Sequence, residues 1–327
     1  MSSPRSVLSA SMAAGLLTLT ACGGGGDGSA PATTSGAWSW SNGAGLTTEL
    51  DARPDTVVVD AYSAAALWPY GVRPDAVFGY GLEEGASSLA LGDADPDEMD
   101  VVGRGGELDI EALAAAGPDL IVGYGSDETD WTQWTWWDDD VAGKVESIAP
   151  FAGVAFQEDV ADVIGQYASL AEALGADVHG AEVVQAEKDF DAAAARLREV
   201  VAAEPDLTVL PLNAAGLASG AYVGNEALAQ MRLLTDLGVT LAGPDGEAGE
   251  AWPEISWEVV DDYPADVVLE YVGSKGEFAD APTYQALPAV KAGQVADWDD
   301  KRPSTYASYA TWLDEVADAY EAADDVA

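Results

Sequence analysis

Short apolar runs alternate with helical stretches from about Asp55 to the end of the 327-residue chain. This alternation is typical of α/β architecture, in which buried parallel strands read as short runs of Val, Leu and Ile. Gly, Tyr or Asp follows most of the runs. The expected strands are residues 56–59, 76–78, 120–122, 207–210, 267–269 and 294–296, and the expected helices are residues 63–70, 110–115, 160–174, 226–237 and 306–322.

One further helix is much longer than the others. Residues 178–203 contain no Pro, and no Gly after Gly180. At 1.5 Å per residue such a helix spans roughly 40 Å, more than one lobe needs. We therefore predict two Rossmann-like lobes, residues 51–177 and 205–327, joined by one connecting helix over 178–204, with a ligand cleft between the lobes. An ordinary surface helix is the alternative.

A short pattern occurs once in each predicted lobe. Glu111 lies eight residues before Asp119, which opens an apolar strand, and Glu258 lies eight residues before Asp266, which opens another. A tyrosine closes each strand five residues after its aspartate. The spacing predicts equivalent surface positions for Glu111 and Glu258, although such helix–strand units are common enough to match by chance.

The N-terminal region is predicted to be a targeting signal. Residues 7–21 are mostly apolar, follow Arg5, and are too few for a membrane-spanning helix, which needs about 20 apolar residues. Residues 1–21 are therefore expected to be a signal peptide. Residues 19–22 resemble the lipobox of bacterial lipoproteins, which implies that Cys22 is lipidated and anchors the chain to the outer face of the cytoplasmic membrane. An ordinary signal peptide with a chance cysteine is the alternative.

Residues 22–50 begin with a Gly-rich and Ser-rich run and are expected to form a flexible tether after Cys22. No later segment has 18 consecutive apolar residues, so we predict no membrane-spanning helix. The body of the protein is then held close to the membrane by its lipid alone.

The charge of the chain argues against several functions. There are 58 acidic and 13 basic residues, giving a net charge of −45, which disfavours nucleic-acid binding. A hydrated surface explains this acidity, and a trap for cations is the alternative. With one cysteine, Cys22, and one histidine, His179, neither an internal disulfide nor a Cys/His zinc site can form.

We find no pattern of residues that indicates catalysis. The glycines near residue 220 are too widely spaced for a phosphate-binding loop, and no Gly-x-Ser-x-Gly elbow is present. Carboxylates are too abundant to single out a hydrolytic pair. We therefore predict no catalytic residue, no intrinsic cofactor and no metal site. An extracellular hydrolase using acidic residues and tryptophans, or a purely structural lipoprotein, is the alternative of another class.

Several segments together resemble one family of binding proteins. Residues 105–113 and 117–122 resemble its first-lobe signature, 255–258 the second-lobe motif and 287–295 the closing segment, while 56–60 and 70–74 also fit. The family comprises the siderophore, haem and cobalamin binding proteins of ABC importers, whose lobes are joined by one long helix. The resemblance covers roughly residues 50–325. It implies that Glu111 and Glu258 dock into arginine pockets on the permease dimer, one from each lobe.

Ligands in open α/β sheets bind beyond the carboxyl ends of the strands. Aromatic rings there provide rigid contact area with polar tips, and arginine offers a fork of donors to chelate oxygens. Arg104, between two glycines, is the preferred anchor, and Arg302 is a weaker one. The predicted ligand-binding residues are Tyr62, Tyr80, Arg104, Tyr124, Trp131, Trp134, Tyr222, Trp252, Tyr271, Trp298 and Arg302.

The segment from Trp131 to Trp137 holds four tryptophans in seven residues. If it is helical, Trp131 and Trp134 share one face and Trp136 and Trp137 lie away from that pair. One pair is expected in the core of the first lobe and the other at the cleft, with packing alone as the alternative.

The family resemblance implies a bulky ligand, delivered by a monomer to the permease dimer. We expect a ferric siderophore, with iron only as part of the chelate. The low content of basic residues favours a hydroxamate or mixed chelate over an anionic catecholate. Cobalamin is the nearest alternative. Haem is less favoured because His179 is the only histidine, although a tyrosine ligand is open.

Overall fold

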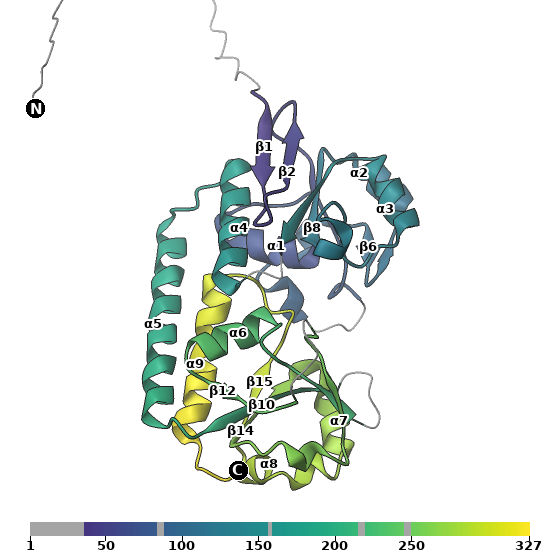
Figure 1. Cartoon of the computed structure of the whole chain (residues 1–327). Helices are drawn as coiled ribbons and strands as arrows, with labels where there is room; N and C mark the ends of the chain where they lie inside the picture. The colour runs from purple at the N-terminus through teal and green to yellow at the C-terminus, as the bar shows by residue number, and fades with distance from the viewer. Residues whose placement is uncertain (1–35, 84–87, 156–158, 215–219, 245–249) are drawn as a thin grey trace, which may run out of the picture. The chain divides into compact units, whose positions relative to one another are not determined.

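The computed structural model describes residues 36–83, 88–155, 159–214, 220–244 and 250–327. Two separate sheets, each with its own helices, lie on either side of a central gap between their ribbons (Figure 1). We call each sheet with its helices a lobe. The predicted signal peptide, residues 1–21, and the first part of the predicted tether, residues 22–35 with Cys22, lie outside the described residues.

The sheet of the first lobe is parallel throughout and has the order β5-β4-β3-β8-β9. Apolar side chains on both faces bury it between helices, as the continuous Val and Ile runs predict. Its strands are β3 (Val57–Asp60), β4 (Ala76–Phe78), β5 (Asp100–Val101), β8 (Leu120–Gly125) and β9 (Phe151–Ala155), and its helices are α1 (Ala61–Leu67), α2 (Ile110–Ala116), α3 (Asp139–Glu146) and α4 (Val160–Ala173).

The second lobe has a mixed sheet in the order β13-β11-β10-β14-β15, with β12 beside β10. Strand β11 runs antiparallel to β10 and β13, and the other pairs are parallel. The strands are β10 (Thr208–Asn213), β11 (Gly220–Val223), β12 (Thr240–Leu241), β13 (Glu254–Ser256), β14 (Val267–Tyr271) and β15 (Val295–Trp298), and the helices are α6 (Ala229–Asp236), α7 (Lys275–Asp280), α8 (Pro288–Ala292) and α9 (Tyr306–Ala322). The predicted α/β fold class is confirmed.

The long helix α5 (Ala181–Ala203) begins beside the first lobe and follows the second for most of its length (Figure 1). Near its start, Val183 packs on the first lobe's core. Phe190, Leu197 and Val201 belong instead to the core of the second lobe. The helix therefore lies along α9 rather than standing free between the lobes. The lobe boundaries at residues 177 and 205 stay a prediction.

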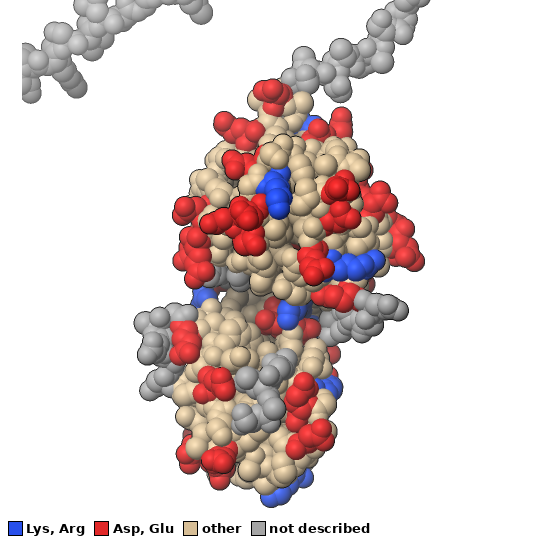
Figure 2. Space-filling view, turned by 90° about the vertical axis from the view of Figure 1, so that its right-hand side faces the viewer, with Lys and Arg blue, Asp and Glu red and all other residues tan. Residues whose placement is uncertain are grey.

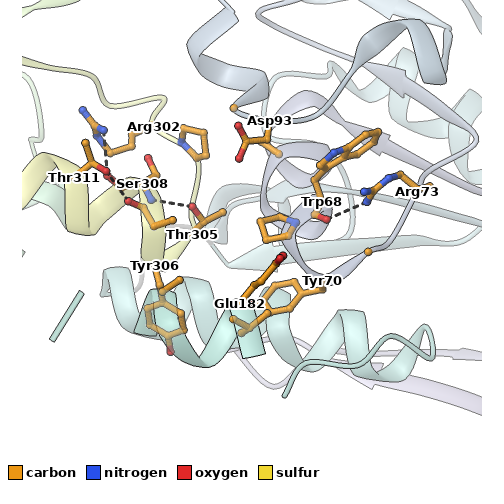
Figure 3. A pocket seen from close by; sticks show the side chains of 18 of the residues that line it. Trp68, Tyr70, Arg73, Asp93, Glu182, Arg302, Thr305, Tyr306, Ser308 and Thr311 are labelled. Carbon is orange, nitrogen blue, oxygen red and sulfur yellow. Dashed lines mark hydrogen bonds between the residues drawn. The ribbon is translucent and has the colours of Figure 1, made fainter. Parts of the chain in front are cut away.

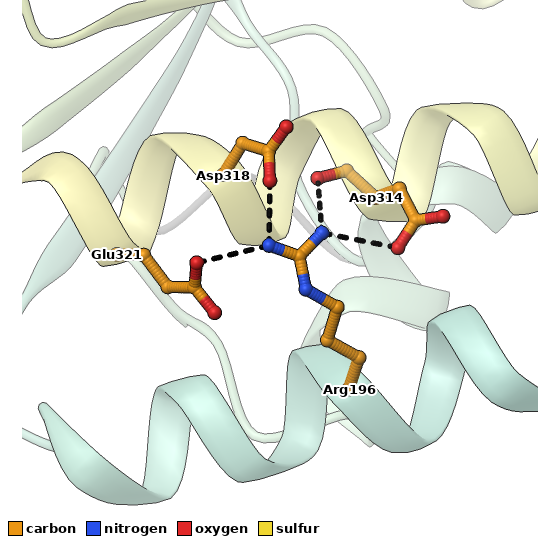
Figure 4. A network of polar contacts seen from close by, with 4 residues as sticks. All are labelled: Arg196, Asp314, Asp318 and Glu321. Atoms are coloured by element: carbon orange, nitrogen blue, oxygen red, sulfur yellow. Dashed lines mark hydrogen bonds and ion pairs between the residues drawn. The ribbon is translucent and has the colours of Figure 1, made fainter.

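An ion-pair network fixes α5 to α9 (Figure 4). The guanidinium of Arg196 contacts Asp314 at 3.1 Å, Asp318 at 2.5 Å and Glu321 at 3.0 Å. These hydrogen bonds, first to Asp318 and then to Asp314, raise the pKa of Arg196. The three carboxylates lie on one face of α9, so the cation of Arg196 reduces the repulsion among them.

One prediction about the tether is wrong. Residues 22–50 were expected to be flexible, but β1 (Trp38–Ser41) and β2 (Thr47–Leu50) form an antiparallel hairpin on the first lobe. Trp38 Nε1 donates to the carbonyl of Ala173 and Trp40 Nε1 to Ser169 Oγ, both at 2.9 Å. Both indole rings are buried, because the alternation of Trp38, Ser39, Trp40 and Ser41 places the two rings on one face of the strand.

Candidate ligand cleft between the lobes

Aromatic side chains from three strand ends and one loop form a wall on the first lobe. Tyr62 follows β3 and stacks on Tyr124 of β8, with ring centroids 5.1 Å apart and an interplanar angle of 10°. Trp136 lies 5.8 Å from Tyr62, 5.6 Å from Tyr80 and 4.7 Å from Trp134. Residue Trp136 is 41% exposed, more than the other aromatic residues of this wall.

A second aromatic group lies at the strand ends of the other lobe. Trp298, which closes β15, stacks on Trp252 at 5.5 Å and meets Tyr271 edge-on at 5.8 Å. Tyr222 of β11 contacts Trp252 at 6.4 Å. Rigid rings with polar tips at facing strand ends suit a bulky ligand that is both apolar and rich in oxygen.

A hydrogen bond links the aromatic wall of the first lobe to the second lobe. Tyr124 Oη lies 3.1 Å from Ser304 Oγ, which belongs to the loop before α9. The hydroxyl of Tyr62 is buried and has no hydrogen-bond partner among the described residues. A buried unpaired hydroxyl is costly, so it is a polar atom that a ligand or water would satisfy.

Burial and nearby carboxylates keep these phenols protonated. Burial raises the pKa of Tyr62, and the negative charge of Asp300 raises it further. The same two causes, in the same order, raise the pKa of Tyr271. At neutral pH both hydroxyls therefore remain protonated, and that of Tyr62, which has no partner among the described residues, can donate a hydrogen bond to a ligand oxygen.

The cationic side chains of the region already have partners. Lys301 Nζ donates to Tyr271 Oη at 2.9 Å and lies 3.8 Å from an oxygen of Asp300. Arg104, predicted as the main anchor, donates to the carbonyl of Leu82. These hydrogen bonds use some of the donors of Lys301 and Arg104 but leave their charge in place, and among the described residues no hydrogen bond or cation–π contact joins Arg104 to the aromatic groups.

The structure separates the four tryptophans of the 131–137 segment by burial. The segment is not helical: a 3₁₀ turn (Asp127–Thr129) precedes it, and Trp131 has a left-handed backbone with φ 60°. Trp134 and Trp298 are both buried. Trp134 packs beneath Trp136, and Trp298 packs beneath Trp252. Trp136 was not among the predicted ligand-binding residues, and its exposure follows from the loop geometry rather than from helical spacing.

A separate pocket of about 810 Å³ lies on the side of the lobe junction next to α5 (Figure 3). Trp68 and Tyr70 line it from the first lobe, Glu182 from α5, and Arg302 and Tyr306 from the second lobe. Among the predicted ligand-binding residues, Arg302 is the one that lines it. Arg302 donates to the carbonyl of Ser308 at 3.3 Å and lies 5.5 Å from the ring centre of Trp312.

The two predicted docking residues are exposed, one in each lobe. Glu111 lies in the first turn of α2, and Glu258 lies in the turn after β13. The face turned toward the viewer in Figure 2 is hollowed between the lobes, and more acidic than basic side chains show on it. Glu111 lies on a helix and Glu258 in a turn after a strand, so their local structures differ, and their docking role stays a prediction.

The described residues contain no group of three or more His, Cys, Asp and Glu side chains placed to hold a metal ion. Within the same described ranges, none of the helices combines the length and apolarity needed to cross a bilayer.

Comparison with known proteins identifies the class of this two-lobe fold. Residues 72–302 match the periplasmic binding protein family. A search of the curated proteins found no match. Among solved structures, the chain is 31% identical to DesE, a ferric-siderophore receptor protein from Streptomyces coelicolor, with a TM-score of 0.81 over 89% of this chain and 100% of that one.

Two more distant structures share the fold. The siderophore periplasmic binding protein from the fuscachelin gene cluster of Thermobifida fusca is 22% identical over 82% of this chain and 96% of that one, with a TM-score of 0.62. Staphylococcus aureus SirA, solved with staphyloferrin B, is 19% identical over 88% of this chain and 99% of that one, with a TM-score of 0.59. The chain belongs to the periplasmic binding protein family, as the sequence motifs indicated, and it is a binding protein rather than an enzyme.

Proposed function

We propose that this chain captures a ferric siderophore in the aromatic cleft and delivers it to the permease dimer of an ABC importer. The observation that carries the proposal is the set of rings at facing strand ends, with Tyr62, Tyr124 and Trp136 on one side and Tyr271 on the other. The similarity to DesE, a ferric-siderophore receptor, over 89% of the chain supports the same ligand class. Iron enters only as part of the chelate.

The charge of the cleft favours a hydroxamate or mixed chelate. The negative charge of Asp300 offsets the positive charge of Lys301, and Arg104 donates to a backbone carbonyl, so the positive charge that a highly anionic tris-catecholate needs is limited. Protonated phenols such as Tyr62 supply hydrogen-bond donors that suit hydroxamate oxygens without requiring charge neutralisation. Cobalamin and haem are the alternative ligands.

The test is an equilibrium titration of the purified full chain, followed by tryptophan fluorescence, with ferrioxamine, ferric enterobactin, haem and cobalamin. We expect ferrioxamine to quench the fluorescence with a dissociation constant in the low micromolar range or below. The dissociation constant of ferric enterobactin should be at least tenfold higher. Trp136→Ala is expected to weaken ferrioxamine binding, whereas Trp312→Phe, in the core of the second lobe, serves as the matched control. Binding of none of the four ligands would contradict the proposal, and tighter binding of enterobactin would contradict its hydroxamate part.

The site of action follows from the N-terminal sequence. We propose that Cys22 carries the lipid, that residues 22–35 tether the body, and that the protein works as a monomer at the outer face of the cytoplasmic membrane. Cys22→Ser is expected to release the protein into the medium while ferric-chelate affinity is unchanged. A variant that stays in the membrane fraction would argue against lipid anchoring.

A further inference from the structure

The loop over residues 126–138 carries Trp136 but contains little regular structure of its own. Apart from its 3₁₀ turn, it is held by backbone hydrogen bonds such as Trp131 N to Ser126 O and Thr135 N to Tyr124 O. Both Asp130 and Trp131 adopt left-handed backbone conformations. The position of Trp136 therefore depends on how the loop is fixed to the sheet.

One buried carboxylate connects this loop to two elements of the aromatic wall. Asp60, at the end of β3, is fully buried. Its Oδ1 caps α1 by accepting from Ser63 N at 2.7 Å. Its Oδ2 accepts from Tyr124 N in β8 at 2.9 Å and from Trp134 Nε1 in the loop at 2.8 Å. Asp60 thus holds α1, which carries Tyr62, together with β8 and the loop.

The indole of Trp134, held by Asp60, packs against the ring of Trp136. Trp134 is buried, and its ring centre lies 4.7 Å from that of Trp136 and 5.3 Å from that of Phe78. Trp136 then contacts Tyr62 and Tyr80. The ring of Trp134 cannot shift without moving its neighbour, because interiors are close-packed.

The sheet beneath the loop lacks side chains where the indole approaches it. A Cβ added to Gly123 would lie 2.8 Å from Trp134 Cδ1 and 3.3 Å from Asp60 Oδ2. A Cβ added to Gly153 would meet the backbone oxygen of Trp131 at 2.1 Å. Two adjacent strands therefore leave room for the loop to lie directly on them, with Trp134 next to Asp60.

We infer that Asp60 is a positioning residue for the binding cleft: through its hydrogen bond to Trp134 it fixes Trp136 and so controls ligand affinity without touching the ligand. This inference rests on the proposed function for its affinity readout. Its structural part, the fixing of the loop, can be measured on the ligand-free protein.

The chain offers a matched pair of variants. Trp134→Phe keeps an aromatic ring but removes the donor to Asp60. Trp137→Phe removes an indole N–H that is buried and has no partner among the described residues, so it loses ring area without losing that bond. Both rings pack on Phe78, so the two variants make comparable changes to the core. Gly123→Ala keeps both Asp60 and Trp134, but its methyl group would occupy the space of the Trp134 indole.

We expect Trp134→Phe to weaken binding of ferrioxamine by the full chain about tenfold through faster dissociation, in line with loss of one buried hydrogen bond. Trp137→Phe should change affinity by less than about threefold, although both variants should shift the urea midpoint of unfolding similarly.

Asp60→Asn retains a helix-capping side chain. Adding Trp134→Phe to it should weaken binding no further, because both changes break the same bond.

Hydrogen exchange of the ligand-free chain separates this inference from the proposed function. Amides of residues 131–137 should exchange faster in Trp134→Phe and Gly123→Ala than in Trp137→Phe. If wild-type protein binds none of the chelates, the proposed function fails, while faster exchange would still support the positioning role. Equal exchange and equal affinity in Trp134→Phe and Trp137→Phe would overturn the inference.

Discussion

Asp119 and Asp266 hold equivalent positions in the two lobes. Asp119 Oδ2 accepts the backbone N–H of Thr56 at 3.0 Å, just before β3, and Asp266 Oδ2 accepts that of Thr208 at 2.9 Å, at the start of β10. Asp119 precedes β8, which pairs in parallel with β3. Asp266 precedes β14, which pairs in parallel with β10. The spacing that the two sequence motifs share therefore corresponds to one structural device used twice.

This device makes stability depend on pH. Burial raises the pKa of Asp266, but hydrogen bonds from the backbone of Val326, Thr208 and Ala327 outweigh it, so the pKa is lowered overall. Backbone hydrogen bonds from Thr56 and Asp55 lower the pKa of Asp119. A carboxylate with a lowered pKa stabilises the fold above its unfolded pKa of about 4, and that stability is lost as pH falls through the folded pKa.

We therefore expect Asp266→Asn to lower the free energy of unfolding by about 2 kcal/mol at pH 7, since it removes hydrogen bonds to a charged acceptor. The difference from wild type should shrink below about pH 4, where the wild-type carboxylate also becomes protonated. Urea unfolding at pH 7 and at about pH 3 measures this. Asp261→Asn, at an exposed position nearby, is the control. An equal difference at both pH values would argue against the assignment.

Arg196 is expected to contribute to stability by reducing the repulsion among three carboxylates of α9. Replacing it with Met keeps the aliphatic stem but leaves Asp314, Asp318 and Glu321 without their shared cation. We expect a loss of about 1 kcal/mol, as befits a partly exposed network. The loss should diminish in about 1 M salt, where exposed charges are screened.

Thermal unfolding at low and high salt checks this expectation. The control is Arg198→Met on the same helix, because the described structure shows no ion pair for exposed Arg198. Equal effects of the two substitutions would show that the network adds nothing specific.

The β1–β2 hairpin is predicted to be part of the stable fold. A chain that starts at residue 36 should unfold at the same urea concentration as the full chain. A chain that starts at residue 51 loses the buried rings of Trp38 and Trp40 and should be destabilised by at least about 3 kcal/mol. Comparison of the two truncations by urea unfolding tests this, and equal midpoints would mean that the hairpin is a mere extension of the tether.

Glu111 and Glu258 are predicted to act in delivery and not in ligand capture. Glu111→Ala and Glu258→Ala should each reduce cellular uptake of the ferric chelate several-fold, because paired contacts to a two-fold permease reinforce each other. Chelate affinity of the purified protein should not change. Glu107→Ala and Glu254→Ala, at exposed positions close by in each lobe, are the controls. Lost affinity in the Glu111 or Glu258 variants would place these residues in the cleft instead.

Local patterns predicted the parts of the fold that depend on local chemistry. Helix α9 has the expected bounds, and β4 coincides with the expected strand. The alternation of Trp and Ser over residues 38–41 is visible in the sequence and is typical of a half-buried strand. The Gly-rich run before it suggested instead that the tether continues through these residues. The hairpin is stable because of contacts to α4, at Ser169 and Ala173, more than 120 residues away.

The α/β class, the long helix and the matched aspartate motifs could be predicted from the sequence alone, because periodicity, the absence of helix breakers and strand-opening residues act over short distances. Which aromatic rings are buried and which are exposed depends instead on tertiary packing. Trp134 and Trp136 are two residues apart, and one is buried against Asp60 while the other is 41% exposed. That difference arises from a loop pressed onto glycines of two neighbouring strands, a long-range packing relationship that no local pattern encodes.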